Sequence, residues 1–400
     1  MTLARPRFLR SIAEIDPAAW NALVSIAAAG RQGPAAATAQ PFLCHEFLLS
    51  LEESGCATGR TGWVPQHLVL QDAAGRLLGA LPLYRKSHSR GEFVFDFAWA
   101  NAYAQYGLKY YPKLVSAIPF TPVSGPRILV HPDTDANATA ASLIRLACDH
   151  AASEGCSSWH VLFPSGGELD LLTGAGLIRR RDCQFHWFNR GYDSFEGFLA
   201  TFTAEKRKKA KRERRRVAEA GIEFDTRHGG DMSEGLWRTV YEFYADTFYR
   251  HGHEPYLNLD FFKRVSERLP ARIMLKIARQ GRDPIALAIF FVGADALYGR
   301  YWGASGNYHS LHFETCYYQG IEYCIEHGLS SFEPGTQGEH KVPRGFVPTM
   351  TGSAHYIADE RFAAAIRDFA VREARSVEGY AAAVNEHVPY HRAVDEELRL

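Results

Sequence analysis

Hydrophobic and polar residues alternate along two segments of the chain, with the two-residue period of a strand. Residues 67–84 and residues 271–291 each contain two such runs separated by a glycine turn, so each segment predicts a hairpin. An aromatic run follows each hairpin and predicts a third strand, which ends at Trp99 in the first half and at Trp302 in the second. The same order of elements is therefore expected twice in one chain.

Each aromatic run is followed by a helix and then by a short strand. The helices are expected over residues 138–155 and 311–328, and both end on a glycine that suits a helix C-terminus. The fourth strands are expected within residues 157–164 and 329–335. A chain of 400 residues exceeds the size of one ordinary core, so the repeat predicts two domains with a boundary near residues 188–195.

The repeat predicts an α/β (α+β) fold of two tandem domains, each a mixed and largely antiparallel sheet flanked by helices. Domain 1 is expected over residues 1–190 and domain 2 over residues 191–400. The composition fits a globular protein, because 46% of the residues are hydrophobic and 22% are charged.

The charges and the cysteines argue against several classes of protein. Lys plus Arg and Asp plus Glu both number 45, whereas a dedicated nucleic-acid-binding domain usually carries a basic excess. The seven cysteines form no C-x-x-C pair, which indicates reduced thiols rather than a disulfide framework or a zinc site. The first residues lack the pattern of a signal peptide and no apolar run is long enough to span a bilayer, so we expect a cytoplasmic protein. We expect no metal site, since the histidine pairs lack further ligands.

One stretch departs from this balance: nine of the eleven residues in 206–216 are Lys or Arg. The apolar residues just upstream recur at the spacing of one helical face, which we expect to dock on domain 2; they are Phe195, Phe198, Leu199 and Phe202. The basic run is either a solvated, charged helix end or a surface for an anionic partner. A tRNA, a nucleotide-linked precursor or a membrane surface with a lipid-linked precursor would supply the anion.

Several long motifs carry a resemblance to a known family. They are PFLCHEFLLSLEESG at residues 41–55, FHWFNRGYDSF at residues 185–195, LYGRYWGA at residues 297–304 and LHFETCYYQGIEYCIEHGLSSFEPGTQGEHKVPRGF at residues 311–346. Over nearly its whole length the sequence resembles the FemAB-like N-acyltransferases, or peptidoglycan biosynthesis/recognition proteins. That family is similar to the Fem aminoacyltransferases, tandem GNAT proteins that move an amino acid from aminoacyl-tRNA to an amine of a peptidoglycan precursor.

The resemblance implies that the donor carbonyl binds where two neighbouring strands part, here residues 296–302 and 330–333. Acyl transfer to an amine needs a base for the ammonium, donors that polarise the carbonyl, and a proton for the leaving group. The candidate catalytic residues are Glu333 as the preferred base, Glu314 as the second choice, His312 and His340 for proton transfer, and Tyr318 as an acid. Structural explanations remain open for each: an ion pair at a strand end, a carboxylate at a helix N-terminus, or core packing.

The segment RYWGASG at residues 300–306 approaches the loop with which GNAT enzymes hold the pyrophosphate of coenzyme A. Arg300 and Gly303 fit that pattern, Gly306 would let backbone amides approach an anion, and Ser305 departs from it. The glycines are equally ordinary turn residues. We expect no tightly bound cofactor, and the donor is acyl-CoA or aminoacyl-tRNA. The corresponding loop of domain 1 lacks both Arg and Gly, so domain 1 is expected to serve acceptor recognition or scaffolding.

Substrate-binding residues are expected on two loops and one strand. Loops held by a rigid sheet often carry function, and residues 334–346 form a loop unusually rich in polar groups, Gln337 among them. The candidates are Trp302, Glu339, Lys341 and Arg344 in domain 2, and Tyr111 and Lys113 in domain 1. The alternatives are a solvated hairpin loop in domain 2 and a stiff, proline-bearing structural loop in domain 1.

These observations predict an N-acyltransferase of class EC 2.3 that moves an activated acyl group to an amine, as in a peptidoglycan precursor, by direct nucleophilic attack. Two alternatives stay open. One is an acyl-CoA-dependent N-acetyltransferase of a small amine, and the other is a non-catalytic protein that binds peptidoglycan or tRNA.

Overall fold

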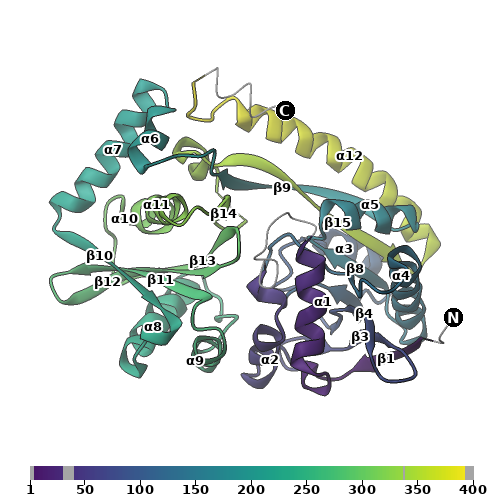
Figure 1. Ribbon diagram of the computed structural model, residues 1–400. Coiled ribbons are helices and arrows are strands. Elements are labelled where there is room, and N and C mark those ends of the chain that lie inside the picture. Colours follow the sequence, from purple (N-terminus) through teal and green to yellow (C-terminus); the bar gives the residue numbers. More distant parts are fainter. Residues whose placement is uncertain (1–3, 30–39, 337, 392–400) are drawn as a thin grey trace. The chain divides into compact units, whose positions relative to one another are not determined.

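The computed structural model describes residues 4–29, 40–336 and 338–391. The chain forms two units, each with its own core. Unit 1 comprises residues 1–182 and 350–378, and unit 2 comprises residues 183–349 and 379–400 (Figure 1).

The strands of unit 2 follow the order β10-β11-β12-β13-β14-β9. Their bounds are β10 Ile222–His228, β11 Ile273–Gln280, β12 Asp283–Val292, β13 Ala296–Ala304, β14 Ser331–Glu333 and β9 Ile178–Phe188. All neighbours pair antiparallel except β13 and β14, which are parallel. A parallel pair needs a crossover, and here a helical segment supplies it.

Helices cover both faces of this sheet. The crossover consists of α10 (Leu311–Phe313), a π-helical turn (Glu314–Tyr318) and α11 (Gln319–Glu326). It lies on one face, and α8 (Glu234–Arg250) and α9 (Leu259–Arg268) lie on the other (Figure 1). The remaining helical elements are α6 (Phe195–Ala200), α7 (Ala204–Glu219), a 3-10 helix η4 (Gly229–Asp231) and a 3-10 helix η6 (Glu339–Arg344). The predicted stripe of Phe195, Phe198, Leu199 and Phe202 is buried, which confirms that this face docks on unit 2.

Unit 1 contains two groups of strands. One has the order β1-β3-β4-β7, with bounds Arg5–Leu9, His67–Gln71, Leu77–Leu81 and Leu129–Val130. The other has the order β15-β8-β6-β5-β2, with bounds Val347–Ile357, Ser158–Leu162, Lys113–Ser116, Tyr84–Lys86 and Trp63–Pro65. The helices are α1 Pro17–Ala29, α2 His45–Glu53, α3 Phe97–Gln105, α4 Ala136–Ser153, α5 Gly166–Gly174 and the first part of α12 (Glu360–Asn385), and the 3-10 turns are Ile12–Glu14 and Pro41–Leu43. Strands β6 and β8 are parallel, with α4 between them in the chain.

Each unit takes one strand from the other half of the sequence. The end of β9, at Trp187 and Phe188, pairs with β14 in unit 2, and β15 pairs through residues 353–357 with β8 in unit 1. We expected two domains that are each continuous in sequence, residues 1–190 and 191–400. The structure places the boundary at residue 182 and returns residues 350–378 to unit 1, because β15 completes that sheet.

Most elements of the predicted repeat are confirmed. The two hairpins are β3–β4 and β11–β12, the two helices are α4 and α10–α11, and the two short strands are β8 and β14. The prediction of an aromatic strand ending at Trp99 was wrong, because residues 97–105 form helix α3. The buried residues of this helix, Trp99 and Tyr103, are four apart, and the alanines between them favour a helix. The third strand of unit 1 is β6 instead.

The cysteines and the helices bear on the predicted class of protein. All seven cysteines lie in the described part of the chain, none of them forms a disulfide there, and four of them are buried. Within residues 4–29, 40–336 and 338–391, no helix combines the length and the apolar character needed to cross a membrane.

Candidate active site

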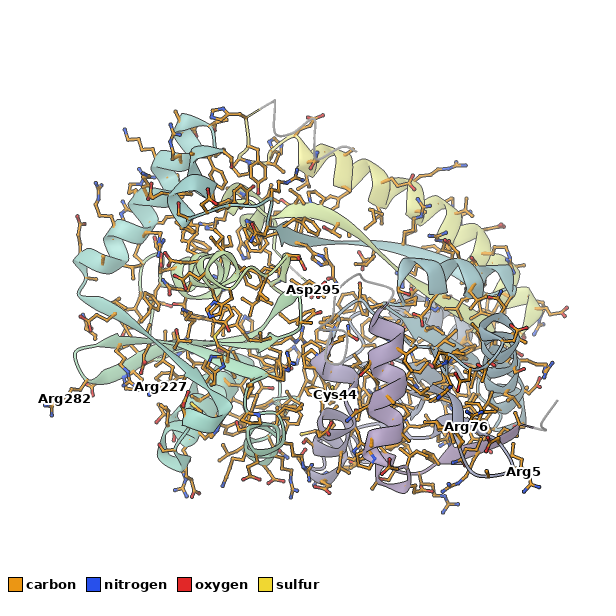
Figure 2. All side chains as sticks on the ribbon, in the orientation of Figure 1. Arg5, Cys44, Arg76, Arg227, Arg282 and Asp295 are labelled. Carbon is orange, nitrogen blue, oxygen red and sulfur yellow. The ribbon has the colours of Figure 1, made fainter. Side chains whose placement is uncertain are left out.

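The ladder of the parallel strands β13 and β14 ends before β13 does, and the resemblance to GNAT proteins predicts that these two segments part beyond it. Their alignment begins at Asp295, labelled in Figure 2, whose carbonyl accepts a hydrogen bond of 2.7 Å from the amide of Ser330. The ladder ends where Tyr298 is paired with Glu333. Strand β13 continues to Ala304 and stays paired with β12 along its other edge. Past Tyr298, β13 therefore no longer has β14 as its neighbour.

Trp302 and Glu333 mark the two ends of this parting. Trp302 is four residues beyond Tyr298, the partner of Glu333, which corresponds to about 13 Å along an extended strand. The indole of Trp302 meets the ring of His312 edge-on at 5.2 Å. The two residues therefore flank one edge of β13 without touching each other.

Aromatic and imidazole rings gather beside Trp302. The ring of His312 lies 5.4 Å from that of Tyr317 and 5.8 Å from that of His340. The Tyr317 hydroxyl and Nε2 of His340 are 2.7 Å apart, within hydrogen-bond distance. Burial lowers the pKa of His312 to about 4 and also lowers that of His340, with help from nearby cations, so both rings are neutral at neutral pH. A neutral imidazole can accept a proton, which suits this cluster to proton transfer.

Glu333 lies at the end of β14 and is buried. Its Oε2 is 4.0 Å from Nε2 of His186, a residue of β9 that was not among the predicted site residues. Lys341, from η6, is also buried, and its Nζ donates a hydrogen bond of 2.6 Å to the carbonyl of Gly335, two residues past Glu333. Burial lowers the pKa of Lys341 to about 7. A carboxylate and a weakly basic amine thus come from the segment just past the β14 ladder.

Arg344 joins η6 to helix α7 through a buried carboxylate. Its guanidinium donates to Glu213 at 2.7 and 3.1 Å, and Glu213 also accepts 2.6 Å from the hydroxyl of Tyr318. Arg344 further donates to the carbonyl of His340 and stacks 3.3 Å over the ring of Phe313. Tyr317 and Tyr318 thus point to different partners, and Tyr318 belongs to a buried ionic network rather than to the ring cluster. Glu213 was missed because it lies inside the basic run.

Glu314 is held by a second ion pair from the same helix. Its carboxylate accepts from Nε of Arg214 at 3.1 and 3.2 Å and from the amide of Gln319 at 2.8 Å. Arg214 also donates 2.8 Å to Glu322. Burial raises the pKa of Glu314, and Arg214 opposes that rise. Both carboxylate oxygens of Glu314 accept hydrogen bonds from Arg214, and one also accepts from Gln319. These contacts give Glu314 a structural explanation that involves no proton transfer.

Gly303 lies inside β13, opposite Leu287, rather than in a loop. A Cβ there would come within 2.4 Å of the backbone of Phe243, so the glycine lets helix α8 approach the sheet closely. The amide of Ser305 donates 2.8 Å to the carbonyl of Ile285 and is thereby used. These contacts do not fit a pyrophosphate cradle at Gly303, and a coenzyme-binding role for Arg300, Gly303 and Gly306 stays a prediction.

The remaining predicted residues lie outside the ring cluster. Glu339 accepts 2.9 Å from the hydroxyl of Tyr380. Tyr111 and Lys113 belong to unit 1, where the Tyr111 hydroxyl and Nζ of Lys113 are each 2.8 Å from Oγ of Ser89. Lys113 is fully buried, so a direct substrate contact would require it to become accessible. Gln337 lies outside the described residues.

The basic run is mostly helix α7, and its two faces differ. Ala210, Glu213 and Val217 face inward and are buried. The outward face carries a groove of about 350 Å³ lined by Ala204 and five cations, which are Arg207, Lys208, Lys211, Arg212 and Arg215. Lys211 pairs with Glu196 and Arg215 with Glu219, both on the exposed surface. Helix α7 is therefore only partly exposed to solvent: its inner face buries the carboxylate of Glu213, and its outer face carries the basic groove.

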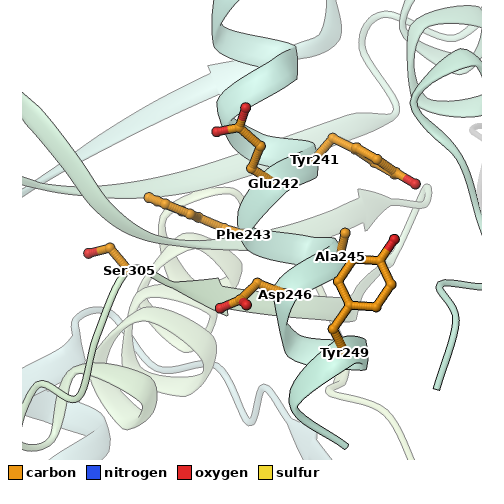
Figure 3. A pocket seen from close by; sticks show the side chains of 7 residues that line it. All are labelled: Tyr241, Glu242, Phe243, Ala245, Asp246, Tyr249 and Ser305. Atoms are coloured by element: carbon orange, nitrogen blue, oxygen red, sulfur yellow. The ribbon is translucent and has the colours of Figure 1, made fainter. Parts of the chain in front are cut away.

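A second pocket, of about 470 Å³, lies on the solvent side of α8 (Figure 3). It is lined by Tyr241, Glu242, Phe243, Ala245, Asp246, Tyr249 and Ser305. Asp246 already pairs with Arg250. The sequence analysis did not predict this pocket. Six of its residues lie on α8, a helix that packs on the sheet through its other residues, and Ser305 follows β13. Across the described residues, no group of three or more His, Cys, Asp or Glu side chains could hold a metal.

Comparison with solved structures places this fold. FemX is similar over 88% of this chain and 98% of its own, with 12% identity and a TM-score of 0.52. L-PGS from Bacillus licheniformis is similar over 84% of this chain and 97% of its own, with 10% identity and a TM-score of 0.50. A tandem GNAT protein from the clavulanic acid biosynthesis pathway aligns over 89% of this chain and 99% of its own, with 12% identity and a TM-score of 0.46. At these identities the likeness concerns the fold alone. No curated protein matches the chain in sequence.

The sequence model of one family matches residues 11–392, almost the whole chain. That family is described as acting in peptidoglycan biosynthesis/recognition. Both units contain mixed sheets flanked by helices, and the fold is similar to that of FemX. The chain belongs to the FemAB-like family of peptidoglycan biosynthesis/recognition proteins.

Proposed function

We propose that this chain is an N-acyltransferase or aminoacyltransferase of class EC 2.3 that transfers an activated acyl group to an amine of a peptidoglycan precursor. One observation carries the proposal: β13 outruns β14, and residues able to move protons lie at both ends of the parting. Acyl transfer at such a strand end would need backbone amides that polarise the carbonyl oxygen.

The reaction proceeds by direct attack of the amine on the carbonyl carbon. The C–N bond forms and the ester or thioester bond to the donor breaks. The attacking ammonium loses two protons: the first goes to Glu333, and the second replaces the proton that the pair formed by Tyr317 and His340 gives to the leaving group. The leaving oxygen or sulfur takes a proton from the pair formed by Tyr317 and His340, whose polar atoms lie 2.7 Å apart. Lys341 carries charge in part of the population near pH 7, and it stabilises the carboxylate or the developing oxyanion.

An aminoacyl ester of tRNA fits this chain better as donor than coenzyme A does. The glycine that would mark a coenzyme A cradle is explained by the packing of Gly303 against Phe243. The groove of helix α7 supplies five cations for a phosphate-rich donor or for the phosphates of a nucleotide-linked acceptor. Unit 1 would recognise the acceptor.

The test is transfer of label by the purified chain. Either a charged tRNA pool or acetyl-CoA is supplied with a muramyl pentapeptide precursor, and a labelled amide is measured. We expect label from charged tRNA and a loss of two to four orders of magnitude in rate for Glu333→Gln. The matched control, Glu326→Gln, removes an exposed acid of helix α11 and should leave the rate unchanged.

Other outcomes decide between the alternatives. Label from acetyl-CoA alone would favour a small-amine acetyltransferase, and no label from either donor would favour a binding protein. Full activity of Glu333→Gln would remove that residue from the base role.

The groove on α7 is tested separately by replacing its five cations with Gln. Binding of uncharged tRNA should weaken, and the slope of log affinity against log salt should fall by about one for each phosphate that is no longer neutralised. Replacing the two exposed cations of α8, Arg238 and Arg250, with Gln is the control, since neither lines the groove. Unchanged binding in the groove variant would return α7 to a solvated, charged helix.

A further inference from the structure

Two phenylalanines at the start of helix α3 in unit 1 are exposed to solvent: Phe95 lies in the preceding loop and Phe97 is the first residue of the helix. Phe95 is 56% exposed and Phe97 is 48% exposed. Their rings are stacked, with centroids 6.1 Å apart and planes 26° apart. Large apolar side chains grouped on a surface commonly mark a binding site. We call Phe95 and Phe97 the aromatic platform.

Two buried lysines tie down the loop that carries the platform. Nζ of Lys113 donates 2.8 Å to Glu92 and also donates to Asp96, the residue between the two phenylalanines. Lys86 donates 3.2 Å to the carbonyl of Arg90 and lies 3.7 Å over the ring of Trp63. Buried charges cost free energy unless they are paired, so a cluster of this kind on an irregular loop is a costly way to fix one backbone conformation.

A third cation, Arg180, also binds the segment that carries the platform. The guanidinium of Arg180 donates 2.8 Å to the carbonyl of Phe95 and binds Glu373 at 2.6 and 2.8 Å. It also lies 5.3 Å over the ring of Trp99. The carbonyl of Phe95 and the carboxylate of Asp96 are thus each held by a charged side chain, while the two phenylalanine rings stay exposed. The platform is preorganised, which lowers the entropy cost of binding a ligand.

The size and chemistry of the platform point to a sugar. Half-exposed phenylalanine rings present together about 200 Å² of apolar surface, far below the roughly 800 Å² that each side of a stable protein interface buries. A membrane-binding surface would need a wider apolar face with free cations beside it, and Arg180 is already paired. One face of a pyranose ring presents C–H groups that pack against an aromatic ring, and it matches this area.

We propose that the aromatic platform stacks against a pyranose ring of the acceptor, an N-acetylated hexosamine of the peptidoglycan precursor. The identity of this sugar rests on the proposed function, whereas the preference for a pyranose face rests on the platform. The exposed rings would account for the acceptor-recognition role of unit 1, with Lys113 acting as a positioning residue behind them.

The test is direct binding, measured by calorimetry without any donor. The probe is a disaccharide pentapeptide made of N-acetylglucosamine and N-acetylmuramic acid, and the free pentapeptide is the comparison. Phe95→Ala/Phe97→Ala should weaken binding of the disaccharide pentapeptide by about tenfold or more and leave the free pentapeptide unchanged. The aromatic variant Phe95→Tyr/Phe97→Tyr should retain binding. Tyr249→Ala, which removes an aromatic side chain 54% exposed in unit 2, is the control.

Three results would overturn the inference. They are unchanged disaccharide binding in the alanine variant, an equal loss for the free pentapeptide, or a loss of binding to phosphatidylcholine vesicles in place of the sugar. The failure of the platform and the failure of the proposed function are distinguishable. Sugar binding that depends on the platform, with no transfer from any donor, leaves the platform standing. Transfer with unchanged sugar binding in the alanine variant removes the platform alone.

Discussion

Each unit contains a pair of parallel strands, β6 and β8 in unit 1 and β13 and β14 in unit 2. The two pairs differ in what lies beyond the end of the ladder. In unit 2, β13 runs on after β14 ends, and rings and charged groups flank the parting. In unit 1, the chain beyond β6 returns to β8, where Gly125 pairs with Pro164 and the amide of Gly125 donates 3.1 Å to Phe163. In unit 1, the loop that contains Gly125 therefore pairs with the chain just beyond β8. No such pairing follows the end of the β13–β14 ladder among the described bridges of unit 2.

A buried guanidinium holds that loop in place. Arg127 is fully buried and donates to the carbonyls of Val123 at 2.6 Å, Pro126 at 2.9 Å and Leu162 at 3.0 Å. Backbone groups that would have been available to a ligand are thus satisfied by the protein itself. Under the proposed function, this closure would leave unit 1 without the donor site proposed for unit 2.

The largest expected effect tests the closure in unit 1. Arg127→Met should lower the free energy of unfolding by about 3–5 kcal/mol, because several buried carbonyls lose their donor. Denaturant unfolding measures the loss, and Arg145→Met, on the exposed face of α4, is the control. Transfer per folded molecule should not change. A stable Arg127→Met protein without transfer activity would show that this guanidinium meets a ligand and that the two strand ends are less different than their contacts indicate.

Lys341 gives a pH dependence specific to unit 2. Its pKa of about 7 in the folded protein is far below that of an unfolded lysine, 10.5, so between these values the unfolded chain binds the extra proton. Stability due to this group should therefore rise from pH 7 to pH 10, by at most about 1.4 kcal/mol per pH unit. Lys341→Met should flatten that rise, and Lys209→Met, on exposed α7, should not. Parallel curves for the wild type and Lys341→Met would mean that the amine is charged in the folded state.

Alanine variants of Gly303 and Gly306 distinguish a packing role of these glycines from a role in binding phosphate. Gly303→Ala places a methyl group 2.4 Å from the backbone of Phe243 and should cost about 1–3 kcal/mol or more. Gly306→Ala meets its nearest atom, on Tyr308, at 3.7 Å and should change the stability by less than about 0.5 kcal/mol. Thermal melts of the two variants measure this. A raised KM for acetyl-CoA in Gly306→Ala, with an unchanged melt, would restore the coenzyme-binding assignment.

The hydrophobic pattern predicts β11, β12, β13, β14 and the helical crossover of unit 2, whereas β10, α8 and α9 were not predicted. It fails at residues 97–105, where aromatic residues favour a strand but the spacing of Trp99 and Tyr103 is helical. It also cannot show that β15 completes the sheet of unit 1, since the pattern of a strand says nothing of which strand lies beside it.

The candidate site is predicted only in part for a similar reason. The structure brings together the rings of Trp302 and His312, chosen from the ends of predicted elements, and of His340, chosen from a polar loop, and their roles stay predictions. Glu213 was not found, because one acid among nine cations gives no sign of facing inward. Its only signal is weak: Ala210, Glu213 and Val217 recur at helical spacing within the basic run.

The last prediction concerns two adjacent tyrosines whose hydroxyl groups have different partners. The Tyr318 hydroxyl donates to buried Glu213, so Tyr318→Phe should cost about 1.5–3 kcal/mol of stability, as for a hydrogen bond to a charged group. Tyr317 meets a neutral His340, so Tyr317→Phe should cost only about 1 kcal/mol of stability but should slow transfer more than Tyr318→Phe does. Melts and rates of the two variants are compared directly. The opposite order, with Tyr318→Phe slower in transfer and equally stable, would move the proton donor from the ring cluster to the network of Glu213 and Arg344. In that case helix α7 would take part in the chemistry as well as in binding.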